Sequence, residues 1–197
     1  MASESITLCS SMIAEKNLKI ALAESATAGW LASEFSLVQD SGKIFLGGIV
    51  CYDACTKEEL FDISKKIIDE FTPESAEVTR MLAERLNKYF KCDIAVAITG
   101  LTSPGGSETD EKPVGTMFIH IKLPGNRYCA HREVFEGSPE DIISQTVERT
   151  GMLLCELVDA IESKTVKVKP PLRKILWIYP GLKYRSAWYW PLFLVPL

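Results

Sequence analysis

Residues 18–30 read LKIALAESATAGW. The first seven form an apolar run that is too short for a helix and predicts a buried strand over 18–24. The segment SATAGWLASEFSLV then combines small residues with helical spacing of its apolar positions, which predicts a turn at Ser25 followed by a helix. Such a unit places the beginning of the helix at the carboxyl end of a strand, where open α/β sheets bind their ligands.

The same alternation of buried strands and helices continues on both sides of this unit. Apolar spacing and turn residues predict helices over 5–17, 54–63, 73–90 and 139–163, and strands over 43–52, 92–100, 114–123 and 127–135. The third of these helices is expected to begin with Thr72 as its N-cap and Pro73 at its first position. Together the elements predict an α/β fold, a three-layer α/β/α sandwich with a mixed, partly parallel sheet.

The composition is that of a globular protein with a substantial core. Of the 197 residues, 47% are hydrophobic and 24% are charged, which excludes wholesale disorder. No apolar run reaches the roughly 18 residues that a transmembrane segment needs. The net charge of −4 gives no general signal of nucleic-acid binding, so no nucleic-acid partner is expected.

The charge divides the chain near residue 164. All 26 acidic residues precede this point and seven of the 22 basic residues follow it, so residues 1–163 carry −11 and residues 164–197 carry +7. The second part also holds three of the four tryptophans and five of the ten prolines. We therefore expect one domain over 1–163 and a basic, aromatic and proline-rich tail over 164–197. A poorly ordered tail and a tail that binds a partner or an anionic membrane surface both remain open.

The six cysteines follow no zinc or redox spacing, and each is expected to be a small buried hydrophobic residue. The first residues, MASESITLCSSMIAEKN, are acidic and amphipathic, unlike a signal peptide. These features predict a cytoplasmic protein with reduced thiols.

Three loops are expected to meet at the carboxyl ends of the parallel strands. They read AESATAGW at 23–30, GGIVCYDACTK at 47–57 and ITGLTSPGGSETDEKPVGT at 98–116. Ser25 in the first loop suits a nucleophile beside an anion site at a helix N-terminus, but the residues alone favour a simple helix cap, because capping serines are common. The third loop contains Pro104-Gly105-Gly106, which could bring backbone N–H groups close to a phosphate or form an ordinary flexible loop.

A serine nucleophile requires a base, and Lys57 is the candidate. A buried lysine has a lowered pKa and can accept a proton. The alternative is a solvated lysine that opens a helix, and Tyr52, five residues earlier, has the alternative role of packing in the core. Both histidines, His120 and His131, fall on the expected hairpin, with no carboxylate obviously placed to orient either of them.

Taken together and in this order, the three loops resemble the CinA carboxy-terminal domain family, and the resemblance covers about residues 5–163. It implies hydrolysis of the carboxamide of nicotinamide mononucleotide to nicotinate mononucleotide and ammonia, a step of the pyridine nucleotide cycle. The resemblance further implies a catalytic serine, lysine and tyrosine without a metal or cofactor, and these fall on Ser25, Lys57 and Tyr52. The positions that match the remaining family motifs, and are expected to bind substrate, are Thr27, Gly29, Thr99, Gly100, Pro104, Gly105 and Gly106.

The chain also departs from the family pattern. It has Ala26 and Ala28 where Cys and Gly are usual, Ala54-Cys55-Thr56 in place of Asn-Glu-Ala, and Thr102-Ser103 in place of Ala-Gly. An arginine-bearing segment usually follows the motif that matches Phe135-Glu136-Gly137, yet here the next arginine is Arg149. Arginine is a natural clamp for phosphate. A second interpretation is therefore a catalytically weak nucleotide-binding member with a regulatory or competence and damage-response role. The expected partner is a small nucleotide, and a homo-oligomer remains open.

Overall fold

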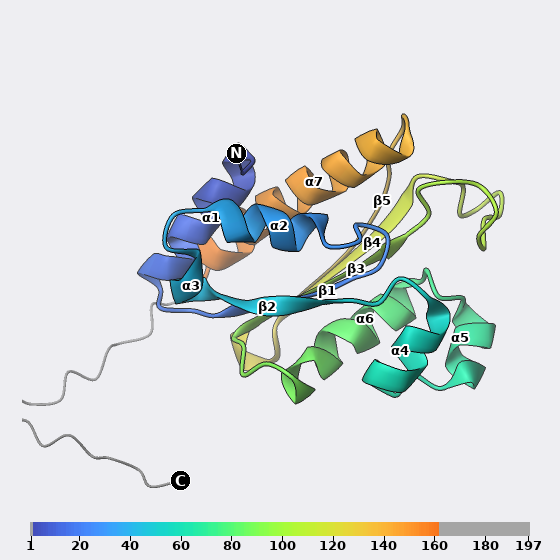
Figure 1. Ribbon diagram of the computed structural model, residues 1–197, viewed down its shortest axis with the longest axis horizontal. Helices are drawn as coiled ribbons and strands as arrows, with labels where there is room; N and C mark the ends of the chain where they lie inside the picture. Colours follow the sequence, from blue (N-terminus) through green and yellow to red (C-terminus); the bar gives the residue numbers. More distant parts are fainter. Residues whose placement is uncertain (1, 162–197) are drawn as a thin grey trace, which may run out of the picture. The chain divides into compact units, whose positions relative to one another are not determined.

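The computed structural model describes residues 2–161, and its centre is a single mixed sheet (Figure 1). The strands follow the order β2-β1-β3-β4-β5. Their bounds are Ile20–Glu24 for β1, Phe45–Val50 for β2, Ile94–Gly100 for β3, Thr116–Lys122 for β4 and Tyr128–Val134 for β5. The first three strands in this order are parallel to one another, whereas β4 and β5 form an antiparallel hairpin on β3.

Helices cover both faces of the sheet, as Figure 1 shows. One face carries α1 (Glu4–Glu15), α2 (Trp30–Leu37) and α7 (Pro139–Asp159), with the short α3 (Ser41–Ile44) leading into β2. The other face carries α4 (Ala54–Phe61), α5 (Lys65–Phe71) and α6 (Ala76–Arg85). Short 3-10 turns occupy Leu86–Lys88 and Pro124–Asn126. The predicted three-layer α/β/α sandwich with a mixed sheet is therefore confirmed.

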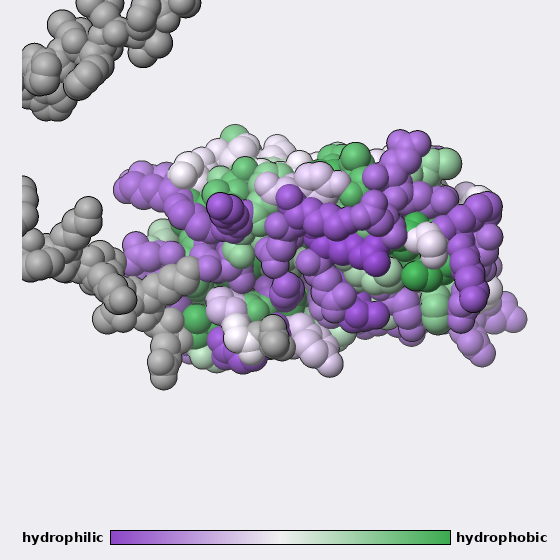
Figure 2. All heavy atoms as spheres, turned by 90° about the horizontal axis from the view of Figure 1, so that it is seen from below, coloured by the Kyte–Doolittle hydropathy of each residue, from purple (hydrophilic) through white to green (hydrophobic). Residues whose placement is uncertain are grey.

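The core divides into two apolar layers because successive residues of a strand point to opposite faces. On the side of α1, α2 and α7, Leu22 of β1 packs with Phe35 and Leu154. On the side of α4, α5 and α6, the smaller Ala23 packs with Phe61. All five residues of β1 are buried, as expected of a central parallel strand covered on both faces. Seen from the side of α4–α6, the outer surface is mainly hydrophilic with small apolar areas between charged side chains (Figure 2).

Helix α6 begins later than the sequence predicts. Its N-cap is Ser75, whose Oγ accepts a hydrogen bond from the backbone N–H of Val78 at 3.3 Å. Thr72 is instead the C-cap of α5, with a φ of 69°. Two cap-forming residues compete here, and the apolar face that α6 presents to the sheet favours the later one. The helix also ends at Arg85 and not at Phe90, because a 3-10 turn follows.

The cysteines are all free thiols, but their burial differs from the expectation. Cys9 and Cys51 are buried, whereas Cys55 is exposed in the first turn of α4 and the other three are partly buried. The expectation of six buried cysteines is therefore wrong. Within residues 2–161, no helix is long and apolar enough to cross a membrane. The predictions for the tail at 164–197 lie outside the described residues.

Candidate active site

A serine and a lysine from different elements meet at the carboxyl end of β1. Lys57 Nζ lies 3.1 Å from Ser25 Oγ. The same Nζ donates hydrogen bonds to the backbone carbonyls of Cys51 at 2.8 Å and Tyr52 at 3.1 Å. Lys57 is 0% exposed and Ser25 is 4% exposed. Lys57 is thus not a solvated lysine, and the alternative interpretation of this residue is wrong.

Parallel pairing of β1 with β2 brings the two residues together. Glu24, the last residue of β1, lies opposite Val50, the last residue of β2, and the Cys51 N–H extends the pairing to the Glu24 carbonyl at 2.8 Å. The chain then turns into α4, where Asp53 is the N-cap and accepts from the Cys55 N–H at 2.7 Å. Lys57, in the first turns of α4, reaches back under the strand end to Ser25.

Burial sets the proton affinity of this lysine. Desolvation by burial lowers the pKa of Lys57 below its ordinary 10.5, because the charged form loses its hydration. The Cys51 thiol and the carboxylates of Glu74 and Asp53 act in the opposite direction and raise this pKa. The balance is a lowered pKa, so a larger fraction of Lys57 is neutral at a given pH than for an exposed lysine.

Glu24, directly before the serine, orders the turn that carries it. The Glu24 side chain is 1% exposed, and its carboxylate accepts four hydrogen bonds. The donors are Thr27 Oγ1 at 2.7 Å and the backbone N–H groups of Gly29 at 3.1 Å, Leu31 at 3.1 Å and Ala32 at 2.8 Å. The carboxylate therefore satisfies the first N–H groups of α2, a favourable position for negative charge at a helix N-terminus.

This arrangement overturns the helix-cap interpretation of Ser25. The N-cap of α2 is Gly29, which adopts a left-handed φ of 95°, and the backbone N–H of Ser25 donates to the Ile98 carbonyl of β3 at 2.9 Å. Thr27 and Gly29 donate hydrogen bonds to Glu24, and neither residue lines the cavity in front of Ser25. Sequence analysis did not single out Glu24, although an acidic residue just before a predicted helix N-terminus was a usable signal.

A cavity of about 250 Å³ lies in front of Ser25. Several predicted site residues line it together with Ser25, namely Tyr52, Gly100, Pro104, Gly105 and Gly106. Thr99 does not line it, because its hydroxyl is buried against that of Thr79 at 2.7 Å. Tyr52 is 65% exposed and does not pack in the core. In the described chain its carbonyl contacts Lys57, whereas its hydroxyl binds neither Lys57 nor Ser25.

A polar clasp joins the third loop to the segment before α6. Lys112 Nζ donates to Ser107 Oγ at 2.7 Å, Thr72 Oγ1 at 2.6 Å and the Glu74 carbonyl at 3.0 Å. Ser107 Oγ in turn donates to Glu74 Oε2 at 2.6 Å. Glu74 also lines the Ser25 cavity, a role that sequence analysis missed. The clasp holds the loop that contains Ser107 and Lys112 against the segment before α6.

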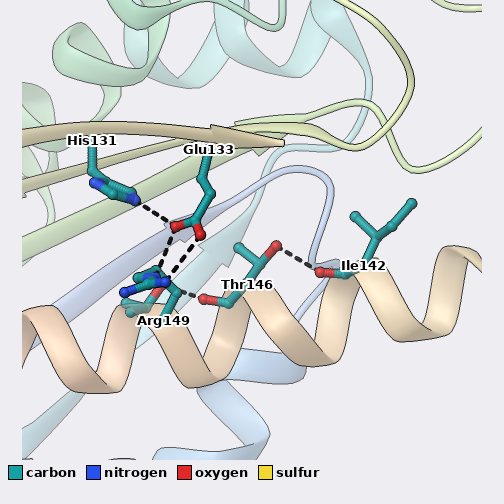
Figure 3. A network of polar contacts seen from close by, with 6 residues as sticks. His131, Glu133, Ile142, Thr146 and Arg149 are labelled. Atoms are coloured by element: carbon teal, nitrogen blue, oxygen red, sulfur yellow. Dashed lines mark hydrogen bonds and ion pairs between the residues drawn. The ribbon is translucent and has the colours of Figure 1, made fainter. Parts of the chain in front are cut away.

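The expected position of the phosphate-clamping arginine holds a helix cap instead. Ser138 and Asp141 form a capping box that begins α7. Arg149 lies further along α7, and its Nε is 2.7 Å from Glu133 Oε2 of β5. Figure 3 shows the two side chains facing each other. Glu133 also lies 2.7 Å from His131 Nε2, because alternate residues of β5 share a face. One histidine therefore does have a carboxylate partner, contrary to the sequence analysis.

Arg149 lines a second, larger cavity of about 700 Å³ and not the one at Ser25. Glu133, Glu34 and Trp30 line this second cavity as well. Within residues 2–161, no group of three or more His, Cys, Asp or Glu side chains is placed to hold a metal ion.

Comparison with known proteins relates the chain to one family. The sequence model described as the CinA C-terminal domain matches residues 3–158. A CinA-like protein of Geotalea uraniireducens is 37% identical over 137 residues, which are 69% of this chain and 32% of that protein. A CinA-like protein of Crocosphaera subtropica is 33% identical over 132 residues, 67% of this chain and 32% of that protein. The chain thus spans about a third of the length of these curated relatives.

Solved structures show the same fold. The crystal structure of the competence damage-inducible protein A (ComA) from Klebsiella pneumoniae superposes with a TM-score of 0.76. The match covers 81% of this chain and 98% of that chain at 21% sequence identity.

Proposed function

Because the chain belongs to the CinA C-terminal domain family, we propose that it is an amidohydrolase that converts nicotinamide mononucleotide to nicotinate mononucleotide and ammonia. The observation that carries this proposal is the buried Lys57 Nζ at 3.1 Å from Ser25 Oγ, facing a cavity at the carboxyl ends of the parallel strands. A nucleophile within hydrogen-bond distance of a desolvated base is the arrangement that acyl transfer requires.

The three contacts of Lys57 suit a neutral amine. A neutral amine has two N–H groups and one lone pair. The carbonyls of Cys51 and Tyr52 can only accept, so they take the two N–H groups. The lone pair then faces the Ser25 hydroxyl and takes its proton as Ser25 Oγ attacks the carboxamide carbon.

The tetrahedral oxyanion needs N–H donors on the other side of the reacting carbon. Ala26 directly follows the nucleophile and lines the same cavity, and its backbone N–H has no hydrogen-bond acceptor within residues 2–161. We assign this N–H group to the oxyanion. The protonated Lys57 then gives its proton to the amide nitrogen, the C–N bond breaks, and ammonia leaves an ester on Ser25. Water, deprotonated by Lys57, cleaves the ester to the carboxylate.

The other site residues position these groups or contact the substrate. The Tyr52 carbonyl orients Lys57. The exposed ring of Tyr52 is available to an aromatic substrate at the cavity edge. Gly100, Pro104, Gly105 and Gly106 form the cavity wall. Thr27, Gly29 and Thr99 act through the backbone that they order and not through substrate contact.

Ammonia release from nicotinamide mononucleotide by the purified full-length protein tests the proposal. We expect turnover that depends on Ser25 and is lost in Ser25→Ala. Equal ammonia release by the two proteins, or none by either, would contradict an amidase with Ser25 as nucleophile.

A second candidate is a nucleotide-binding member of weak activity, because a substrate phosphate without a basic partner is held poorly in position for the reaction. Among the described residues, no lysine or arginine lines the cavity, and Arg149 is engaged by Glu133. Calorimetric binding of nicotinamide mononucleotide without ammonia release would support this candidate. Efficient turnover would contradict it.

A further inference from the structure

The Ser25 cavity contains one carboxylate that the proposed reaction does not use. Glu74 lies between α5 and α6, just before the N-cap of α6, and is one of the residues that line the cavity with Ser25 and Tyr52. Its Oε2 accepts the hydrogen bond from Ser107 Oγ at 2.6 Å.

The charge of Glu74 has no direct counterion in the described chain. Lys112 reaches the carboxylate only through Ser107, while its direct contact with Glu74 is to the backbone carbonyl. The hydrogen bond from Ser107 orients the carboxylate but leaves its negative charge in place. A carboxylate that is oriented and lacks an ion pair attracts a cation that enters the cavity.

No other charged side chain among the described residues lines this cavity. The remaining lining comes from Ser25, Ala26, Tyr52 and the loop from Gly100 to Gly106. Lys57 lies buried behind Ser25, and its lowered pKa reduces its positive charge. The described lining therefore contributes a single charge, the negative charge of Glu74, together with the exposed aromatic ring of Tyr52, which can contact a cation through its face.

We propose that Glu74 is a specificity-determining residue that selects carboxamides whose aromatic ring carries a fixed positive charge over neutral carboxamides. The inference rests on the proposed function, since it takes the Ser25 cavity as the substrate site. The favoured class is an N-substituted pyridinium carboxamide, and the disfavoured class is the neutral amide of the same ring. The carboxylate supplies the discrimination because only the cation offsets the cost of desolvating it.

A cationic ring beside Glu74 would also act on the base. Glu74 raises the pKa of Lys57, as do Asp53 and the Cys51 thiol. A positive charge placed against Glu74 counteracts its field at Lys57. Binding of the favoured substrate class therefore increases the neutral fraction of the lysine that must accept the proton from Ser25.

Binding of two ligands that differ only in ring charge tests the inference. The protein is full-length Ser25→Ala, which prevents turnover, and the ligands are nicotinamide and the cation formed by methylating its ring nitrogen. We expect calorimetry to show that Glu74→Gln in this background lowers the affinity for the cation about tenfold or more, which is the scale of one lost charged contact. The affinity for nicotinamide should change less than about twofold, which is within the range of a small surface effect.

The matched control is Glu77→Gln, which removes the same charge from the first turn of α6 without touching the cavity. It should leave both affinities unchanged. In the Ser25→Ala protein that keeps Glu74, added salt should weaken binding of the cation but not binding of nicotinamide. This measurement needs no variant at position 74. Equal weakening of both ligands in Glu74→Gln, or an unchanged preference for the cation, would overturn the inference.

The two proposals fail separately. Ammonia release that depends on Ser25, with no charge preference, would refute only the role of Glu74. A charge preference that Glu74→Gln abolishes, in a protein that releases no ammonia, would refute only the amidase.

Discussion

At the scale of single residues, the central feature is a lysine removed from water. Lys57 is fully buried, its Nζ contacts one hydroxyl and two carbonyls, and the described chain gives it no direct ion pair. A charged lysine in such surroundings is costly, so burial favours the neutral amine, at a cost in folding free energy. The effect on catalysis and the effect on the free energy of unfolding can be measured separately.

Removing either member of the pair should abolish catalysis. We expect Ser25→Ala and Lys57→Met each to lower kcat for ammonia release by about 10³-fold or more, and the double variant to lose little more, because the two residues act as a unit. Methionine keeps much of the buried volume of the lysine side chain. Additive losses in the double variant would mean that the residues act independently, and near-normal activity of Lys57→Met would mean another base.

The lowered pKa of Lys57 also predicts how stability and activity depend on pH. Between the lowered pKa and 10.5, the unfolded lysine is protonated while the folded lysine is neutral, so the unfolded state binds more protons. The contribution of Lys57 to the free energy of unfolding therefore rises with pH across this window and reaches its full value above 10.5.

Urea unfolding of the wild type and Lys57→Met at several pH values measures this effect. The wild type should gain stability relative to Lys57→Met as the pH rises through the window. The value of kcat/KM should rise over the same window, with its midpoint below 10.5, because only neutral Lys57 accepts the proton. A stability difference that does not vary with pH would show that Lys57 keeps its ordinary pKa.

At the scale of elements, the unit of β1 and α2 depends on the buried carboxylate of Glu24. We expect Glu24→Gln to reduce the free energy of unfolding by about 1–3 kcal/mol, because a single amide oxygen cannot replace two carboxylate oxygens and their charge. Activity should fall as well, since Glu24 orders the turn of Ser25. Urea unfolding compares this variant with Glu59→Gln, which alters an exposed carboxylate of α4 and should stay within about 0.5 kcal/mol of the wild type.

Two glycines of the third loop have similar backbone geometry but different surroundings. Gly105 and Gly115 adopt left-handed φ values of 98° and 95°. A Cβ at Gly115 would lie 2.0 Å from the carbonyl oxygen of Phe135, whereas a Cβ at Gly105 would meet nothing within 4 Å. Both alanine variants carry the same left-handed strain of about 1–2 kcal/mol.

Gly115→Ala should therefore cost at least about 2 kcal/mol more stability than Gly105→Ala, because only the former must displace backbone. Chemical denaturation of the two variants gives the difference directly. Equal losses would mean that the junction between the third loop and the end of β5 is easily deformed.

At the scale of the whole molecule, the end of the described domain packs into the apolar core. The last turn of α7 packs Val158 into the apolar layer of α1 and α2, Ile161 joins it, and Lys16 Nζ binds the Ile161 carbonyl at 2.6 Å. We expect truncation after Ser163 to leave the fold and any amidase activity intact and to improve solubility, because it removes a segment rich in aromatic residues. Thermal melts of the full-length and truncated proteins test this expectation, and a loss of more than about 2 kcal/mol would show that the tail packs on the domain.

Local patterns were sufficient for the order of the strands and the other helices, whereas the short helices α3 and α5 fall outside the predicted helices. The apolar run at 18–24 and the alternation around it predict β1 and its neighbours, because hydrophobic periodicity reflects which face a residue buries. Capping is also local, and the predicted start of the last helix at residue 139 agrees with α7, whose N-cap is Ser138. The same rule fails at Thr72 because Ser75 is an equally good cap, and the packing of α6 on the sheet chooses between them.

The sequence by itself determined the three-layer fold and the family to which the chain belongs, since both follow from patterns and motifs within short stretches. It placed Ser25, Tyr52 and the glycine-rich loop at strand ends, but it left open whether the Lys57 side chain is buried or solvated. Only the tertiary structure decided that question, and it alone gave Glu24 and Glu74 their surroundings. The physical reason is that desolvation and electric field depend on every segment packed around a group, and residues distant in the sequence supply those segments.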